Sequence, residues 1–108
     1  MSVIMGTQSG ENSEGSKNVW IGHYQGASSK ATNSVLIGSG SSVKGNFTLG
    51  IGHYTNINAN KGLAIGSYNT LTSNATESGV FGQGEYGKSA IDASGSYSIG
   101  NYNHISGN

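Results

Sequence analysis

The sequence predicts an all-β fold: a parallel β-roll or β-solenoid with coils of 14–18 residues, in one domain spanning residues 1–108. The first observation is a repeat in which a short apolar run ends in glycine. It occurs seven times, at Gly6, Gly22, Gly38, Gly52, Gly66, Gly82 and Gly100. The gaps between these key glycines are 16, 16, 14, 14, 16 and 18 residues. A near-constant period is typical of one structural unit stacked on copies of itself.

Composition is the second observation that favours this fold. Only 33% of the residues are hydrophobic, 19 are glycine, and none is proline or cysteine. So few apolar residues suit a ladder, in which each coil buries its apolar face on the next coil. The charged fraction of 9% and the net charge of zero argue against disorder, which is associated with high net charge.

Composition also excludes some partners. The chain has five lysines, no arginine and five acidic residues, so it lacks the basic patch that nucleic acid requires. No apolar stretch approaches the roughly 18 residues of a membrane span, so we expect no membrane insertion. Residues 1–15 lack the basic region and long apolar core of a signal peptide. We expect either an excised segment of a longer exported protein or a virion component.

The first strand of each coil is predicted to end at the key glycine. Residues three and one before the glycine share one face of this strand, because side chains alternate along a strand. Nearly all are apolar, so we predict that they form a buried stripe. The stripe comprises Val3 and Met5, Val19 and Ile21, Val35 and Ile37, Leu49 and Ile51, Leu63 and Ile65, Gly79 and Phe81, and Tyr97 and Ile99.

The second strand of each coil is predicted to centre five residues after the key glycine. These positions form a second apolar stripe: Ala27, Val43, Ile57, Leu71, Gly87 and Ile105. The longer gaps after Gly66 predict loops that bulge outward around residues 74–78 and 85–94. Lysines 30, 44, 61 and 88 are expected on outer turns, where they discourage sideways pairing of strands.

The residue two before the key glycine is predicted to face away from the buried stripe. It is nevertheless Trp20 and Leu36 in neighbouring coils. Strands that are buried on both faces read as continuous apolar runs, as residues 35–37 do. We therefore expect a second buried face that identical chains cover, and we predict a homo-oligomer.

The segment Asn33-Ser34-Val35-Leu36-Ile37-Gly38-Ser39-Gly40-Ser41 is similar to the NSVAIGxxS motif of YadA-like head repeats in trimeric autotransporter adhesins. Residues 17–22 and 62–66 look like looser copies, and repeats of phage tail fibres are also similar. The resemblance covers nearly the whole chain. It implies a left-handed parallel β-roll, a homotrimer and a role in attachment. The family's binding of matrix protein, carried over to matching positions, points to Asn33, Ser34, Ser39 and Ser41.

Aromatic and polar residues that follow the key glycines suggest a receptor-binding strip. Equivalent positions of successive coils lie above one another, so Tyr54 and Tyr68 are predicted to stack or to sit one strand spacing apart. An aromatic face covers a pyranose ring while polar neighbours bond its hydroxyls. The candidate residues are His23, Tyr24, His53, Tyr54, Tyr68 and Tyr102. The alternative is an aromatic ladder that stiffens a corner or fills a subunit interface.

The histidines and carboxylates predict neither a metal site nor a catalytic site. His23 and His53 are two coils apart, roughly 10 Å, which is too far for one ion within a subunit. An ion held by three copies of one histidine, whether His23, His53 or His104, requires a three-fold axis between subunits. We expect surface histidines, no metal and no cofactor. Glu77, Glu85 and Asp92 are expected to be solvated loop charges.

The predicted function is a non-enzymatic structural and adhesive fibre module. It attaches a phage virion or a bacterium to a cell-surface receptor, either a glycan or a matrix protein, and belongs to a virion tail fibre or the bacterial cell surface. The alternative is a polysaccharide-degrading tail-fibre or tailspike enzyme that uses Glu77, Glu85 or Asp92. An ice-binding solenoid is excluded, because no coil position supplies an unbroken rank of threonine.

Overall fold

The computed structural model describes residues 1–26 and 30–107, which form two parallel β-sheets and no helix. The larger sheet has seven strands: β1 (Val3–Met5), β2 (Val19–His23), β3 (Val35–Ser39), β5 (Leu49–His53), β7 (Leu63–Ser67), β9 (Gly79–Gln83) and β11 (Tyr97–Ile99). The smaller sheet has five: β4 (Ser42–Val43), β6 (Asn56–Ile57), β8 (Thr70–Leu71), β10 (Ile91–Asp92) and β12 (Ile105–Ser106). The predicted all-β solenoid of short coils is confirmed.

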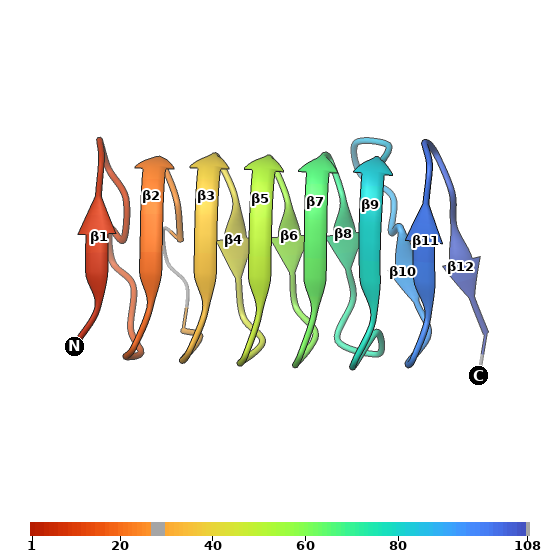
Figure 1. The fold of residues 1–108 in the computed structure, drawn as a ribbon, viewed down its shortest axis with the longest axis horizontal. Helices are drawn as coiled ribbons and strands as arrows, with labels where there is room; N and C mark the ends of the chain where they lie inside the picture. The colour runs from red at the N-terminus through yellow and green to blue at the C-terminus, as the bar shows by residue number, and fades with distance from the viewer. Residues whose placement is uncertain (27–29, 108) are drawn as a thin grey trace.

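The coils stack into a rod whose long axis crosses the strands (Figure 1). Each strand of the larger sheet pairs in parallel with the equivalent strand of the next coil, as β3 does with β5. The molecule measures 35 × 20 × 18 Å, which agrees with the roughly 30 Å expected for seven coils at a strand spacing of about 4.8 Å. The number of repeats in the sequence, multiplied by the strand spacing, therefore gives the length of the rod.

The key glycines form one column across the larger sheet, and backbone contact explains the residue type. Gly38 pairs with Gly52, and Gly52 pairs with Gly66. A Cβ atom on Gly52 would lie 1.7 Å from the carbonyl oxygen of Gly66, and its φ is +136°. No side chain fits in that space, and the backbone conformation disfavours every residue except glycine. The column therefore sets how closely the coils approach.

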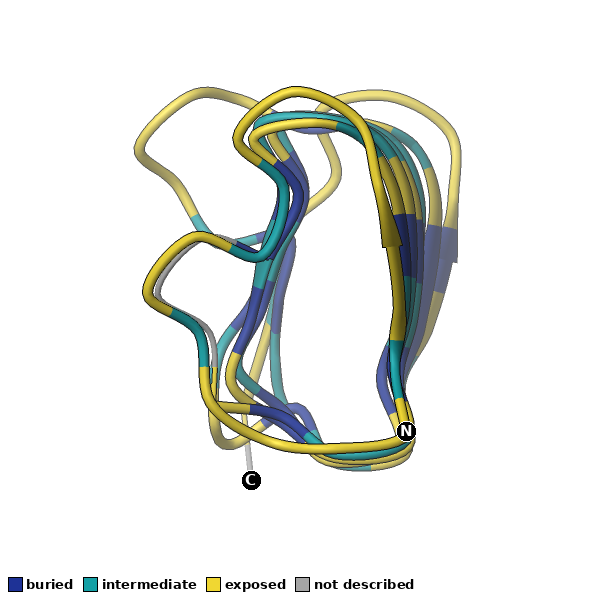
Figure 2. Cartoon of the chain, turned by 90° about the vertical axis from the view of Figure 1, so that its left-hand side faces the viewer, coloured by how far each residue is buried: buried dark blue, intermediate teal, exposed yellow. Residues whose placement is uncertain are grey.

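The core corrects the predicted orientation of the long strands. The residue two before the key glycine faces inward, and Trp20 and Leu36 are fully buried. They pack between the sheets in a cluster with Val43, Ile57 and Leu71 of the opposite wall. The residues at the two flanking positions point outward instead, because a shift of one residue exchanges the faces of a strand. Figure 2 shows buried segments along both long walls of the cross-section.

The interior is narrow, so large and small residues complement each other. A Cβ on Gly26 would lie 2.5 Å from the Trp20 ring, and one on Gly50 would lie 2.7 Å from Leu36.

Buried polar groups in the core bond to one another. The Trp20 indole nitrogen donates to Ser34 Oγ at 2.9 Å, and Ser34 Oγ donates to Asn18 Oδ1 at 2.8 Å. Such pairing satisfies buried polar groups that would otherwise lower stability.

The second apolar stripe is confirmed at Val43, Ile57, Leu71 and Ile105 but not at Gly87. Ile91 takes that place and pairs with Leu71, because the loop over residues 85–88 inserts extra chain before it. The loop rises above its neighbours in Figure 1, as the long gap predicts. The prediction for Ala27 lies outside the described residues.

Candidate functional site

The first candidate surface is the outer face of the seven-stranded sheet. The side chains predicted to be buried there form a band that we call the outer stripe. Its most exposed members, at 36–83% accessibility, are Val3, Met5, Ile21, Ile37, Ile51, Phe81, Tyr97 and Ile99. Register places Ile37 between Ile21 and Ile51, so the band runs along the rod. Contiguous apolar surface of this kind marks contact with another molecule.

The second candidate surface begins at the corner where the long strands end. The second residue after the key glycine has a left-handed backbone there, with φ of 57° for Tyr24, 52° for Tyr54 and 56° for Tyr68. Its N–H continues the ladder around the corner, as Tyr54 N–H donates to the Ser39 carbonyl at 2.9 Å. The left-handed conformation costs an L-residue about 1–2 kcal/mol. Gly40 occupies the same position in its own coil, at φ 69°, and as a glycine it adopts this conformation without strain.

The aromatic rings of this corner contact one another. Tyr54 and Tyr68 stack with centroids 5.6 Å apart and planes inclined by 23°, which confirms the predicted stack. His53 lies edge-on to Tyr54 at 4.2 Å. Tyr86, in the loop after β9, approaches Tyr68 at 6.0 Å and 83°. Two parallel rings and one perpendicular ring thus form an aromatic corner with faces in two directions.

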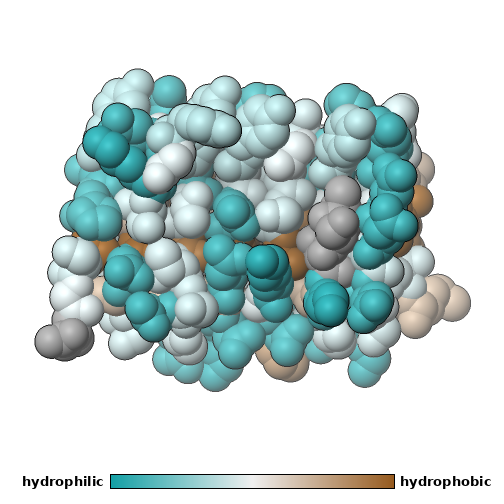
Figure 3. Space-filling model, turned by 180° about the vertical axis from the view of Figure 1, so that it is seen from behind, coloured by the Kyte–Doolittle hydropathy of each residue, from teal (hydrophilic) through white to brown (hydrophobic). Residues whose placement is uncertain are grey.

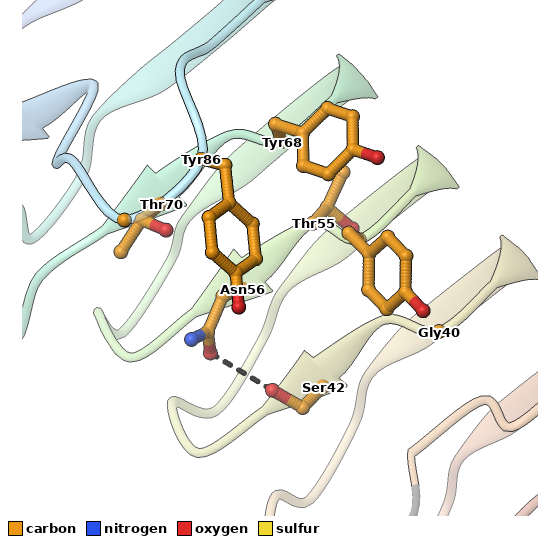
Figure 4. Close-up of a pocket in the computed structure, with 9 residues that line it drawn as sticks. Gly40, Ser42, Thr55, Asn56, Tyr68, Thr70 and Tyr86 are labelled. Carbon is orange, nitrogen blue, oxygen red and sulfur yellow. Dashed lines mark hydrogen bonds between the residues drawn. The ribbon is translucent and has the colours of Figure 1, made fainter.

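Two adjoining hollows run along this corner, and together we call them the groove. One, of about 310 Å³, lies beside Tyr54, Tyr68 and Tyr86 (Figure 4). The other, of about 410 Å³, lies between Tyr24 and Tyr54. Gly40, Ser42 and Tyr54 line both hollows, so the groove is continuous across several coils.

The smaller sheet supplies a polar side to the groove. Ser42, Asn56 and Thr70 begin β4, β6 and β8 and lie in register on the outer face. Ser42 Oγ donates to Asn56 Oδ1 at 2.8 Å, the dashed line in Figure 4. Asn56 and Thr70 line the same hollow as Ser42. The groove therefore combines aromatic faces with a repeating row of hydrogen-bonding groups.

The groove is electrically neutral. Among the described residues that line it, none is a lysine, an aspartate or a glutamate. Glu85 and Lys88, which flank Tyr86 in sequence, pair with each other at 3.3 Å. Seen from behind, the face of the smaller sheet is mostly hydrophilic with a thin apolar line (Figure 3). A neutral ligand is thus favoured over a charged one, because no counter-charge is present to offset desolvation.

The structure brings five of the predicted receptor residues together in the groove: His23, Tyr24, Ser39, Tyr54 and Tyr68. Ser41 also borders the groove, but its side chain is buried and bonded to Thr55. His53 contacts Tyr54 and Tyr68 edge-on but lines neither hollow. Tyr102 occupies the same ladder position but lines neither hollow. Asn33 lies near the opposite end of the strands, and Ser34 is buried in the bonds to Asn18 and Trp20. We therefore leave Asn33 and Ser34 out of the site.

Sequence reasoning missed Ser42, Thr55, Asn56, Thr70 and Tyr86. A signal existed for Ser42, Asn56 and Thr70, since each is a polar residue four positions after its key glycine. Tyr86 is also four positions after its key glycine, Gly82, but the inserted loop takes it out of register with those three residues, because Ile91 rather than Gly87 pairs with Leu71. Its position depends on where that loop folds.

The three carboxylates considered for catalysis each have a different partner. Glu77 pairs with Lys61 at 2.9 Å, and Glu85 pairs with Lys88. Asp92 accepts hydrogen bonds from Thr72 Oγ1 and, at 3.2 Å, from Asn74 Nδ2. These bonds, Thr72 first, lower the pKa of the Asp92 carboxyl below its usual value. In the part of the chain that the structure describes, no three histidine or acidic side chains gather as metal ligands.

Comparisons with protein-family models, curated proteins and solved structures found no match to this chain. The described segments contain no helix with the length and hydropathy needed to cross a membrane. Functional assignment therefore rests on the geometry of the outer stripe and the groove.

Proposed function

We propose that this chain is a non-enzymatic, homotrimeric attachment module of a phage tail fibre or a bacterial surface. In this proposal, the outer stripe is the contact between subunits and the groove faces the receptor, a glycan or a matrix protein. The observation that carries the proposal is the outer stripe, an apolar band on the exposed face of the larger sheet.

The pattern of exposure supports a contact with identical chains. Val35, Leu49 and Leu63 are half-buried, and Ile37 and Ile51 beside them are exposed. Parallel strands that are apolar on both faces are typical of sheets covered on both sides. Three copies of one chain cover the stripe by the same contact repeated around an axis. The number three comes from the resemblance to YadA-like head repeats.

The separate placement of the two surfaces supports attachment. The outer stripe lies on the seven-stranded sheet, whereas the groove lies at its edge and over β4, β6 and β8. Subunit contact through the stripe thus leaves the groove open. A trimer presents three grooves, and simultaneous binding raises the overall affinity without any new contact.

Sedimentation analysis tests the assembly. The native protein is expected to sediment at three times the chain mass of 11.0 kDa. The double variant Ile37→Asp with Ile51→Asp is expected to dissociate, because it buries charges in the contact. The control is Ser73→Asp, which adds charge at an exposed residue away from the stripe and is expected to leave the trimer intact.

A native protein of 11.0 kDa in solution, or a double variant that remains trimeric, would contradict the subunit contact. Attachment is tested separately by binding of the labelled native protein to bacterial or host cells. Incubation with surface polysaccharides is expected to leave their chain length unchanged. Shortened chains would instead support the enzymatic alternative.

A further inference from the structure

The tyrosine ladder has a gap at Gly40. Tyr24, Tyr54 and Tyr68 occupy the same place in their coils, and Gly40 occupies it in the coil between Tyr24 and Tyr54. A Cβ on Gly40 would lie 2.7 Å from Cε1 of Tyr54, so the Tyr54 ring leans over the glycine. The hollow of about 410 Å³ lies between this ring and Tyr24. We call this hollow the slot.

The two rings on either side of Gly40 are exposed. Tyr24 and Tyr54 are 43% and 51% accessible, so their rings gain little from burial. Their left-handed φ values belong to the corner of the repeat, because Tyr68 and Tyr102 share them. Exposed aromatic rings that gather beside a hollow are typical of a binding surface.

We propose, on the basis of the attachment function proposed above, that the slot binds one pyranose ring of a linear, neutral glycan. The ring lies in the hollow that Tyr24, Gly40 and Tyr54 line. The adjoining units of the glycan extend along the rod, over Tyr68 and beside Tyr86.

The chemistry of the lining residues fits such a ligand. The C–H faces of a pyranose ring pack on aromatic rings, as Tyr24 and Tyr54 allow. Ser39 and Ser42 line the slot with half-buried side chains, and serine hydroxyls both donate and accept hydrogen bonds, as sugar hydroxyls do. Ser41 also lines the slot, but its hydroxyl is buried and accepts a hydrogen bond from Thr55 Oγ1 at 2.8 Å. Of the described residues, no lysine, aspartate or glutamate lines the slot, so a neutral sugar loses less on desolvation than an anionic one.

The repeat explains why the ligand is linear. Polar groups recur from Ser42 to Asn56 to Thr70, one per coil. Their spacing follows the strand spacing of about 4.8 Å, which is close to the length of one sugar unit in an extended chain. Tyr86 stands perpendicular to Tyr68 and bounds the far end of the groove. A glycan aligned with the rod thus meets equivalent groups at each step.

The test uses the full chain, a panel of linear oligosaccharides of glucose, galactose, mannose or N-acetylglucosamine, and titration by NMR. Native protein is expected to bind at least one of them, with shifts at Tyr24 and Tyr54. Gly40→Tyr fills the slot with the residue that this ladder accepts in other coils, and it is expected to weaken binding about tenfold or more. Tyr54→Asn is expected to do the same, because asparagine keeps the left-handed backbone while removing one face.

The matched control is Tyr102→Asn, which makes the same change at the same ladder position outside the groove. It is expected to bind like the native protein. Thermal unfolding of each variant separates a blocked slot from a lost fold. If Gly40→Tyr fails to fold, the comparison of glycan binding by Tyr54→Asn and Tyr102→Asn is sufficient to test the slot.

Each result has a distinct meaning. Equal binding by native protein, Gly40→Tyr and Tyr54→Asn would overturn the slot as the site. Binding of the panel by none of these proteins, with attachment of the native protein to cells retained, would overturn the glycan and leave the attachment function standing. Loss of both kinds of binding in the native protein would overturn both proposals.

Discussion

The column of key glycines is the strongest determinant of the fold among single residues. Within the column, Gly52 faces the Gly66 backbone, whereas a Cβ on Gly100 would meet only the side-chain amide of Asn103, at 3.1 Å. The two glycines share a positive φ, of 136° and 123°. They therefore differ in backbone collision but not in conformational strain, which makes them a matched pair.

We predict that Gly52→Ala lowers the free energy of unfolding by about 3–5 kcal/mol, because backbone overlap adds to the strain of a positive φ. Gly100→Ala is expected to cost about 1–2 kcal/mol, from the strain alone. Urea unfolding followed by circular dichroism measures both values. Equal losses in the two variants would show that contact between coils does not select glycine at this column.

Some features of single residues were predictable from the sequence, whereas others depended on how side-chain volumes fit together in the core. The spacing of the glycines and the stack of Tyr54 on Tyr68 follow from period alone. The inward orientation of the residue two before each key glycine was not predictable, because these residues differ from coil to coil. In three successive coils they are Trp20, Leu36 and Gly50. They differ because Leu36 fills the space beside Gly50. Uniform apolar residues are therefore a poor guide to the interior of a narrow roll.

Among the elements, the long strands were predicted correctly in place and wrongly in orientation. A period of two fixes which residues share a face but not which face is inward. The second wall decides which face is inward, because Val43 and Ile57 share one buried cluster with residues two before a key glycine, such as Leu36. Residues 35–37 are apolar on both faces because one side meets the core and the other forms the outer stripe.

The inserted loop over residues 85–88 is an addition to a standard coil. The gap from Gly82 to Gly100 is 18 residues, whereas the coils that begin at Gly38 and Gly52 have 14. The chain on either side keeps its ladder bonds, since Gly84 N–H donates to Ser67 and Ala90 N–H to Thr70. The loop therefore contributes Tyr86 to the groove without taking part in the stacking.

We predict that deletion of residues 85–88 preserves the fold, because it restores the 14-residue coil length found elsewhere in the chain and keeps Ile91 in the second stripe. The midpoint of thermal unfolding is expected to remain within a few degrees of the native value, as for a change confined to an exposed loop. Deletion of residues 58–61 from a 14-residue coil is the control and is expected to prevent folding. Loss of the fold in the first variant would show that the loop is structural.

At the scale of the whole molecule, the rod is held together by contacts between neighbouring coils. The inner strands β5 and β7 each pair on both sides, whereas β1 pairs with β2 alone and β11 with β9 alone. Stability of such repeats is approximately a sum of terms within coils and between neighbours. The length of the rod was predictable from the seven key glycines, because each contributes one strand. The homotrimer remains a prediction.

We predict that amide hydrogen exchange of the 108-residue chain is slowest in the middle of the rod. The amides of Leu49 and Leu63 are expected to exchange at least about tenfold more slowly than those of Val3 and Gly100. All four donate hydrogen bonds to a neighbouring coil, but coils with one neighbour open locally at lower cost. Exchange is followed by NMR on the native protein. Uniform rates along the larger sheet would show that the coils open together as one unit.

The glycine column has a consequence for how this surface changes over time. The step from coil to coil is fixed where main chains touch at the key glycines, so the separation of positions such as 24, 40, 54 and 68 does not depend on which side chains they carry. Exposed residues are thereby free to diversify while their geometric grid persists. A lineage under pressure to recognise new surfaces can exchange tyrosines, serines and asparagines one at a time without having to rebuild the scaffold beneath them.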